Sequence, residues 1–420
     1  MKTQIHKILI KLRADPKRVI TLPSFYPGLD RVKRIYLRIA DLSMIDSENL
    51  LKEINRQFGH RHKNIESIYM DNYNLFKKHY EEYNELPELK KRLLGATLTK
   101  EYSIQSAALF NPSMVPHPNQ SGLQKGEKRF LISLRSVGEG HISSIEFRSG
   151  IVDEKGNLSI DETSPFALKG RVYDKEKLDY KLQLPMDSLL SERVLFPQTE
   201  PESMGMEDVR LVLFDEGGEE QTYFGTYTAY NGKKIKSQLF ETKDFLNFQI
   251  HSLTGKAVAD KGMAIFPEKV NGKYVIISRQ GGENISIMFS DDPFHWENFQ
   301  LLMEPKYSFE FSQIGNCGSP IKTEKGWVLL THGVGPMRDY TISAALLDLD
   351  DPSKVISRLN RPLIWAEGEE REGYVPNVVY SCGGMLHDDI FYIPYAMSDS
   401  MAGFAWLNIN ELLDELKENK

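Results

Sequence analysis

Residues 205–214, with the sequence GMEDVRLVLF, place two carboxylates and a guanidinium immediately before an apolar run. Glu207, Asp208 and Arg210 therefore lie where the run predicts that a strand begins. Water alone satisfies a charge at the surface, so three charged side chains within four residues indicate a pocket. A buried ion pair between Arg210 and Glu207 is the alternative role for this arginine.

Other polar side chains occupy comparable places at the ends of predicted strands further along the chain. Taken alone, such a residue is most often a solvated surface charge or part of a turn. Their recurrence in each group of predicted strands favours a shared polar pocket instead. The residues are Asn111, Arg135, Tyr227, Tyr230, Lys261, Arg279, His332, Arg338, Tyr395 and Asp399.

The residue types in this predicted pocket point to its ligand. Carboxylates, asparagine, tyrosine and arginine suit a polyhydroxylated sugar, whose hydroxyl groups both donate and accept hydrogen bonds. Four potential cations suit a dianion, because guanidinium and ammonium groups match phosphate oxygens. They are Lys261, Arg279, His332 and Arg338. A sugar together with a phosphate is the simplest joint interpretation.

The first 99 residues are predicted to form a helical extension. Apolar side chains recur at three- or four-residue spacing in residues 47–58 and 60–80, which is typical of amphipathic helices. Pro87 marks the start of another short helix. The aromatic stripe on such a helical hairpin makes homo-oligomer formation through this extension an expectation.

Beyond about residue 100 the sequence predicts strands, which are needed to bring the polar residues together. Five similar units occur, and each has a strand, a turn rich in small polar residues, and a second strand. They occupy residues 129–150, 223–248, 274–299, 326–353 and 391–409. We therefore predict an all-β fold, a five-bladed β-propeller over residues 100–409, followed by a short C-terminal helix over 410–420. A β-sandwich is the alternative, but it does not explain the aspartate and aromatic residue that end the units.

Composition narrows the class of protein. The chain has 420 residues and a net charge of −7, so it lacks the basic excess of a nucleic-acid-binding protein. No run is long and apolar enough for a signal peptide or a membrane span, and a cytoplasmic protein is expected. Two cysteines, Cys317 and Cys382, are expected to be reduced. Histidines and cysteines do not fall at metal-ligand spacings, so no metal site is predicted.

Seven motifs in this chain resemble those of glycoside hydrolase family 130, the β-mannoside phosphorylases and mannosidases. In order they are FNPS, GMEDVR, TYTAY, KGMAIFPEK, the Ser-Arg of IISRQ, GWVLLTHGV and VPNVVYSCG. The resemblance extends from about residue 105 to 400, and the helical region resembles an extension found in some members. Val209 departs from the family, where many members carry proline, but the charged residues around it are kept.

This resemblance implies inverting phosphorolysis in the funnel of a five-bladed propeller, with inorganic phosphate as co-substrate and no cofactor. By the motif match Asp208 is the proton donor, which in relatives acts through a sugar hydroxyl. Asn111 and Asp399 match sugar-contacting positions, and Arg135, Glu207, Arg210 and Tyr230 are further candidates for sugar binding. Lys261, Arg279, His332 and Arg338 are the candidates for the phosphate site. The Lys-Gly-Met-Ala motif resembles members that act on β-1,2-linked mannosides and release α-mannose 1-phosphate.

Two alternatives remain open from the sequence. A β-mannosidase of the same fold would use water in place of phosphate, and it would need a second carboxylate as base. It would also gain little from a cluster of cations. A non-catalytic glycan-binding propeller would more often expose aromatic platforms than enclose an acid beside cations.

Overall fold

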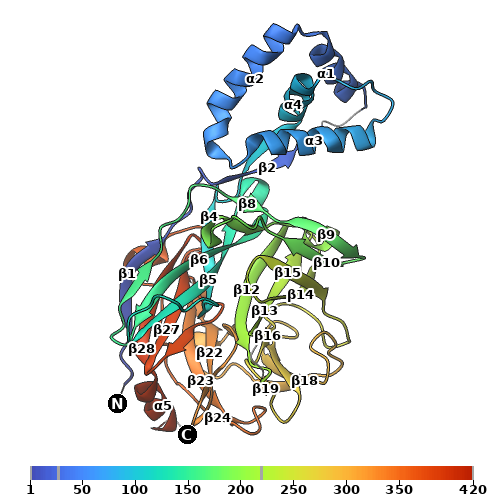
Figure 1. The fold of residues 1–420 in the computed structure, drawn as a ribbon. Helices are drawn as coiled ribbons and strands as arrows, with labels where there is room; N and C mark the ends of the chain where they lie inside the picture. The colour runs from blue at the N-terminus through green and yellow to red at the C-terminus, as the bar shows by residue number, and fades with distance from the viewer. Residues whose placement is uncertain (1, 26–28, 218–220, 419–420) are drawn as a thin grey trace. The chain divides into compact units, whose positions relative to one another are not determined.

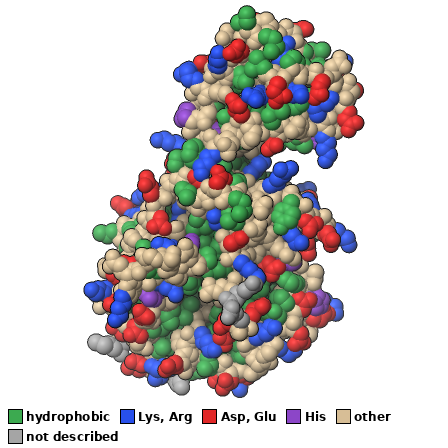
Figure 2. Space-filling model, in the orientation of Figure 1, with side chains coloured by type: hydrophobic (Ala, Val, Ile, Leu, Met, Phe, Trp, Pro, Cys, Tyr) green, Lys and Arg blue, Asp and Glu red, His purple; other side chains and the backbone are tan. Residues whose placement is uncertain are grey.

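The computed structural model describes residues 2–25, 29–217 and 221–418, and the chain divides into two compact units (Figure 1). The helical unit comprises Pro16–Ile104 and Ser164–Ala167, and the β unit comprises Met1–Asp15, Gln105–Thr163 and Leu168–Lys420. Among the described residues, no helix has the length and apolarity needed to cross a membrane. Figure 2 shows acidic and basic side chains interspersed over the face in view, without separation by sign.

The helical unit packs around aromatic side chains. Its elements are β2 (Val19–Pro23), α1 (Leu29–Asp41), α2 (Met44–Phe58), η1 (Gly59–Arg61), α3 (Ile65–His79), α4 (Glu88–Thr97) and β3 (Thr99–Ser103). Helix α2 begins after Ser43, whose Oγ accepts a hydrogen bond from the N–H of Asp46 at 3.0 Å, as an N-cap serine does. Phe76 is fully buried against the rings of Tyr36 and Tyr80. Burial of this aromatic stripe holds α1 and α3 together.

The β unit is built from strands arranged in antiparallel runs. The first run is β4 (Ala108–Pro116), β5 (Glu127–Val137), β6 (Ser143–Asp153) and β7 (Leu158–Ile160). The second is β12 (Gly205–Phe214), β13 (Thr222–Tyr230), β14 (Ile235–Thr242) and β15 (Asn247–Ser252), extended by β10 (Asp179–Gln183) and β9 (Arg171–Glu176). A parallel bridge from Gly205 to Ser143 joins these runs into one sheet, to which β8 (Leu168–Lys169) and β11 (Arg193–Leu195) also belong.

Three separate sheets follow along the chain. One contains β16 (Ala264–Ile265), β17 (Tyr274–Ser278), β18 (Ile285–Ser290) and β19 (Gln300–Met303). The next contains β20 (Gln313–Asn316), β21 (Ile321–Thr323), β22 (Gly326–Val334), β23 (Tyr340–Leu347) and β24 (Val355–Arg358). The last contains β25 (Val379–Tyr380), β26 (Met385–His387), β27 (Ile390–Met397), β28 (Met401–Asn408) and β1 (His6–Leu12), and α5 (Ile409–Glu418) follows it.

Short 3₁₀ turns connect several of these strands. They are η2 (Glu139–His141), η3 (Leu190–Glu192), η4 (Glu200–Glu202), η5 (Ser308–Glu310), η6 (Pro336–Arg338) and η7 (Gly368–Arg371). Cys317 and Cys382 are both free and buried. Of the polar residues singled out in the sequence, Asn111 lies in β4, and Glu207, Asp208 and Arg210 lie in β12.

The expectation that residues 1–99 are helical is wrong for residues 6–12 and 19–23, which form strands β1 and β2. Along β1, HKILIKL, partly buried and exposed side chains alternate with the period of two of a half-buried strand, although Ile8, Leu9 and Ile10 are all apolar. Strand β1 pairs antiparallel with β28, so the last sheet combines the two ends of the chain. The sequence does not reveal this alternation, because Ile8, Leu9 and Ile10 form a continuous apolar run and β1 is far in sequence from the other strands of its sheet.

We predict that Ile8 in β1 contributes to the stability of the β unit and that its neighbour Leu9 does not. Ile8 packs against the buried cluster around Phe404, whereas Leu9 is 98% exposed. Ile8→Ala should lower the free energy of unfolding by about 1–2 kcal/mol, because it removes partly buried methyl and methylene groups. Leu9→Ala removes similar groups that are already exposed to solvent, so it should change the free energy of unfolding by less than about 0.5 kcal/mol. Equal effects in urea titrations of the two variants would contradict this orientation of β1.

Candidate active site

Asn111 and Asp208 meet at matching irregularities in two neighbouring strands. The register of β4 shifts between Phe110 and Ser113, and the register of β12 shifts between Glu207 and Arg210. Asn111 and Asp208 adopt left-handed backbone conformations at these bulges, with φ of 47° and 53°. The Asn111 Nδ2 donates a hydrogen bond to Asp208 Oδ1 at 2.7 Å. Bulges redirect side chains and often occur beside active sites, and here they turn an amide and a carboxylate toward each other.

Arg135 in β5 binds both carboxylates of the Glu207–Asp208 pair. Its Nη2 donates to Glu207 Oε1 at 2.6 Å, and its Nη1 donates to Asp208 Oδ1 at 3.2 Å. The Nε donates to Ser143 Oγ at 2.9 Å, which fixes the plane of the guanidinium. One arginine therefore holds two adjacent carboxylates in place through charge-assisted hydrogen bonds.

Arg210 lies behind this group and is only 2% exposed. Its Nη1 donates to the backbone carbonyl oxygen of Asp208 at 3.0 Å, and its Nη2 donates to the Tyr380 hydroxyl. The alternative role of Arg210, an ion pair with Glu207, is absent among the described contacts, and Arg135 pairs with Glu207 instead. Arg210 thus supports the backbone at Asp208.

Arg279 and His332 form a second polar group. The Arg279 Nη1 lies 2.9 Å from His332 Nε2, and both residues are buried. Because a guanidinium only donates, His332 Nε2 accepts this hydrogen bond. Neither Arg279 Nε nor the two side-chain polar atoms of Asn316 has a hydrogen-bond partner within the described residues. The centroid of the His332 ring lies 4.9 Å from that of Tyr380, which links this group to Arg210.

Lys261, Asp399 and Arg338 approach the same region from other loops. The charge of Lys261 lowers the pKa of Asp208, Glu207 and Asp399, so its ammonium group lies near all three carboxylates. Gly262, with φ of +90°, brings the following backbone close to Arg279, and a Cβ there would lie 3.7 Å from Arg279 Nε. Arg338 is exposed and acts on Asp399 in the same electrostatic way.

Three tyrosines from the sequence analysis lie outside this group. Tyr230 ends β13 opposite Gly205, and none of its described hydrogen bonds or ion pairs reaches the group. The hydroxyl of Tyr227 donates to Glu202 Oε1 at 2.6 Å inside the β unit. The Tyr395 hydroxyl donates to Glu370 Oε1 at 2.8 Å. Buried tyrosine hydroxyls need partners, so these two residues serve the packing of the strands.

Burial and neighbouring charges shift the pKa values of the three carboxyl groups in different directions. Burial raises the pKa of Asp208, but the charges of Arg135 and Lys261 outweigh this effect and hold it below its usual range. Burial and the negative charge of Asp208 raise the pKa of Asp399 to about 6. Burial also raises the pKa of Glu207, against the opposing effect of Arg135. Asp208 is therefore the carboxyl group of the three that stays ionised down to the lowest pH without ligands.

The state of His332 differs from the expectation of a fourth cation. Burial and the adjacent charge of Arg279 lower its pKa well below the usual value, so His332 is neutral at pH 7. A neutral imidazole that accepts a hydrogen bond from Arg279 orients that guanidinium instead of adding a charge. The cations of the site are therefore Lys261, Arg279 and Arg338 together with the paired Arg135.

The raised pKa of Asp399 gives a testable pH dependence of stability. In the unfolded chain this carboxyl group ionises near pH 4, but in the folded protein it ionises only near pH 6. The free energy of unfolding of the wild type therefore falls as the pH rises from about 4 to about 6. Asp399→Asn removes this decrease, so its Tm relative to wild type should rise between pH 4 and pH 7. Asp388→Asn is a matched control, because the two aspartates have φ of 50° and 49° and Asp388 is exposed. A Tm difference for Asp399→Asn that does not change with pH would contradict the assignment.

Several residues of the site were not found from the sequence. Asn316, Tyr380 and Ser143 join the two groups or fix their arginines. Asn316 could have been found from the sequence, because it is a polar residue at the end of the first strand of its sheet. Asn111 and Asp208 likewise lie in the first strands of their runs. Nothing in the local sequence indicates that the buried hydroxyl of Tyr380 belongs to the site. In the described ranges, no group of three or more histidine, cysteine or carboxylate side chains has the arrangement of a metal site.

Comparison with known proteins assigns the chain to a family. The sequence model of glycoside hydrolase family 130, described as beta-1,4-mannooligosaccharide phosphorylase, matches residues 187–418. A 1,2-beta-oligomannan phosphorylase from Thermoanaerobacter sp. (strain X514) is 36% identical over 228 residues, which are 53% of this chain and 75% of the relative. A beta-1,2-mannobiose phosphorylase of the same organism is 37% identical over 217 residues, covering 50% of this chain and 70% of the relative.

Solved structures share the fold. The beta-1,2-mannobiose phosphorylase of Listeria innocua, in complex with beta-1,2-mannobiose, superposes with a TM-score of 0.53 at 22% identity. The match covers 76% of this chain and 94% of that protein, and both are mostly β-strand with a few helices. The family model spans more than half of the chain and includes the strand that carries Asp208. The chain belongs to glycoside hydrolase family 130.

Proposed function

We propose that this protein catalyses the phosphorolysis of β-mannosides, with β-1,2-linked manno-oligosaccharides as substrates and α-mannose 1-phosphate as product. The observation that carries the proposal is the position of Asp208, a buried carboxylate held by Asn111 and Arg135 beside a set of cations, in a chain of family 130. The names of its relatives, as phosphorylases of β-1,2-linked mannosides, support the same substrate class.

In the proposed reaction Asp208 donates the proton that the leaving sugar requires. A phosphate oxygen attacks the anomeric carbon on the face opposite the glycosidic oxygen, and the carbon–oxygen bond to the leaving sugar breaks. The leaving oxygen takes up the proton of Asp208, and inversion converts the β-mannoside into an α-phosphate. Phosphate replaces the water and the second catalytic base of a hydrolase. Sugar hydroxyl groups are bound by the remaining polar side chains, which are those of Glu207, Asn111, Asp399 and Arg135.

Phosphate binding also explains how an ionised Asp208 can become an acid. Lys261 contributes to the low pKa of Asp208. Arg279 lies close by, since its Nε would be 3.7 Å from a Cβ on Gly262, the residue that follows Lys261. A phosphate bound between these cations offsets their charge and adds negative charge of its own. Both effects raise the pKa of Asp208, so the carboxyl group would hold a proton once the co-substrate is bound. No cofactor is needed for this chemistry, since phosphate supplies the nucleophile.

A five-bladed β-propeller is the proposed architecture of the β unit. The five antiparallel runs would be the blades, with β4, β12, β16, β20 and β25 as their inner strands and β1 as the outer strand of the last blade. Contacts between consecutive runs support a closed ring. They join Leu211 with Ser113, Thr226 with Met263, Gly262 with Asn316, Gly318 with Cys382, and Cys382 with Pro112.

The helical unit is proposed to mediate homo-oligomer formation. It exposes large apolar side chains along α1 and α2, in contrast to the buried aromatic stripe of its core. These side chains are Leu37 (48% exposed), Met44 (50%), Ile45 (72%), Leu50 (44%) and Phe58 (40%). Sedimentation of the full chain tests this assignment, and a monomer at all concentrations would refute it.

Incubation with β-1,2-mannobiose in the presence and absence of phosphate tests the proposed activity. Phosphate-dependent release of α-mannose 1-phosphate, followed by ³¹P NMR, is the expected result. Mannose release that does not require phosphate would identify a β-mannosidase. Binding without turnover would identify a glycan-binding protein. The same assay with β-1,4-mannobiose tests the linkage preference.

A further inference from the structure

A cavity of about 530 Å³ lies between two loops of the β unit, at residues 336–339 and 365–377. Its volume falls within the range of about 300–1,000 Å³ that is typical of small-molecule sites. None of the residues proposed above for catalysis, sugar binding or phosphate binding lines it. It nevertheless adjoins the candidate active site, because Arg338, in the first of these loops, acts electrostatically on Asp399.

The second loop contacts the strand end that carries Asp399. The Ser398 Oγ donates a hydrogen bond to the carbonyl oxygen of Glu370 at 2.7 Å, and the N–H of Val375 donates to the carbonyl oxygen of Ser398 at 3.0 Å. The cavity and the Asp399 position therefore share a wall. A ligand that extends from Asp399 toward residues 370–375 would therefore reach this cavity.

The side chains that line the cavity combine an aromatic face with mixed hydrogen-bonding groups. Trp365 is 42% exposed and Met337 is 90% exposed, so apolar surface is available to a ligand. Asp339, Glu367 and Arg371 contribute charged donors and acceptors. Hexoses need this combination, since their carbon-bound hydrogens pack on aromatic rings while their hydroxyl groups form hydrogen bonds.

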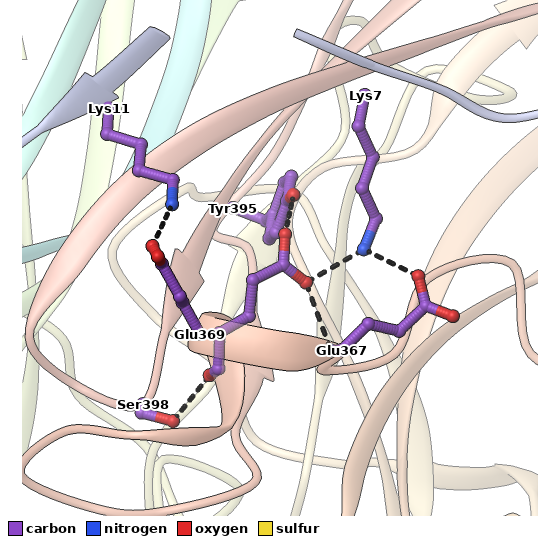
Figure 3. Close-up of polar contacts among 7 residues, drawn as sticks. Lys7, Lys11, Glu367, Glu369, Tyr395 and Ser398 are labelled. Atoms are coloured by element: carbon purple, nitrogen blue, oxygen red, sulfur yellow. Dashed lines mark hydrogen bonds and ion pairs between the residues drawn. The ribbon is translucent and has the colours of Figure 1, made fainter. Parts of the chain in front are cut away.

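Residues of β1 and β27 anchor η7, which forms one wall of the cavity, through hydrogen bonds and ion pairs. Glu370 is 9% exposed and accepts hydrogen bonds from Lys7 Nζ and from the Tyr395 hydroxyl, both at 2.8 Å. Lys7 also pairs with Glu367 at 3.3 Å, and Lys11 pairs with Glu369 at 3.2 Å. Figure 3 shows both lysines of β1 reaching toward η7, with Tyr395 between them and Ser398 below in this view. Such anchoring reduces the entropy lost when a ligand orders this loop.

We propose that this cavity is a distal subsite, which binds mannosyl units beyond the cleaved bond in substrates longer than a disaccharide. This proposal rests on the proposed function, because it takes the Asp208 group as the place where the terminal mannosyl unit is released. Trp365 stacks on a sugar ring, and Arg371 and Glu367 bind its hydroxyl groups. A disaccharide is too short to use the cavity, so the subsite confers a preference for longer chains.

Chain-length dependence of kcat/KM tests the subsite. Phosphorolysis of β-1,2-linked mannobiose and mannotetraose is compared for wild type, Trp365→Ala, Arg371→Ala and Tyr173→Ala. Trp365→Ala and Arg371→Ala should lower kcat/KM for the tetrasaccharide about tenfold and for the disaccharide less than twofold. Tyr173 is a matched aromatic control, since it is 60% exposed and lines a different cavity. Equal losses on both substrates, or no loss on either, would overturn the subsite.

A fluorescence measurement keeps the subsite testable if the proposed reaction fails. The chain has four tryptophans, of which Trp296 and Trp327 are fully buried and Trp406 is partly buried. Acrylamide quenching of the native protein therefore reports mainly on Trp365. Mannotetraose should protect the protein from quenching, mannobiose should not, and Trp365→Ala should abolish the effect. Protection without phosphorolysis would refute the proposed function and retain the subsite, whereas turnover without protection would do the reverse.

Discussion

Replacement of Asp208 by asparagine is expected to lower kcat for β-1,2-mannobiose by about 10³-fold or more, at the upper part of the range for loss of a general acid. The fold should persist, because asparagine tolerates the left-handed backbone at φ of 53° and its side-chain oxygen can still accept from Asn111. Arg135 also keeps its ion pair with Glu207. An unchanged Tm and retained binding of mannobiose would show that chemistry alone is lost.

A substrate with an activated leaving group separates the acid role from other roles of Asp208. A dinitrophenyl β-mannoside needs no protonation of its leaving oxygen, so Asp208→Asn should lose far less activity on it than on mannobiose. Equal losses on both substrates would indicate that Asp208 acts by binding or positioning. Near-normal turnover of mannobiose by the variant would exclude Asp208 as the acid.

Replacement of Arg279 by alanine is expected to raise the KM for phosphate about 10- to 100-fold, with a change of less than about threefold in the KM for mannobiose. Arg279 is buried, its Nε lacks a hydrogen-bond partner within the described residues, and His332 fixes its guanidinium. Loss of one charge-assisted hydrogen bond to a dianion costs about 1.5–3 kcal/mol, which corresponds to this range. In the reverse reaction, the KM for α-mannose 1-phosphate should rise in parallel.

Arg338→Ala provides the comparison for this prediction. Arg338 was also assigned to the phosphate site from the sequence, but its side chain is exposed and solvent screens its charge. Its effect on the KM for phosphate should therefore be several-fold smaller than that of Arg279→Ala. If Arg279→Ala changed the two KM values equally, or if Arg338→Ala had the larger effect, the anion site would lie elsewhere.

Local sequence determined the elements and the charged motif of this protein. Short runs rich in β-branched and aromatic residues specified the strands after about residue 100, and apolar residues at three- or four-residue spacing specified helices α2 and α3. The adjacency of Glu207 and Asp208 is covalent, so any fold would bring them together. The polar residues at the ends of the predicted strands were also recognisable, because charged and amide side chains are uncommon inside a sheet.

The tertiary structure alone decided which side chains pair and which carry charge. Arg210 is two residues from Asp208, yet Arg135, from another strand, binds its carboxylate. His332 is neutral because it is buried beside Arg279, and Tyr380 joins groups that are far apart in the sequence. Hydrogen bonds and pKa shifts depend on distance and on exclusion of water, and both are set only when separate strands pack. For this reason the residue types of the site were readable from the sequence, whereas their partners and protonation states were not.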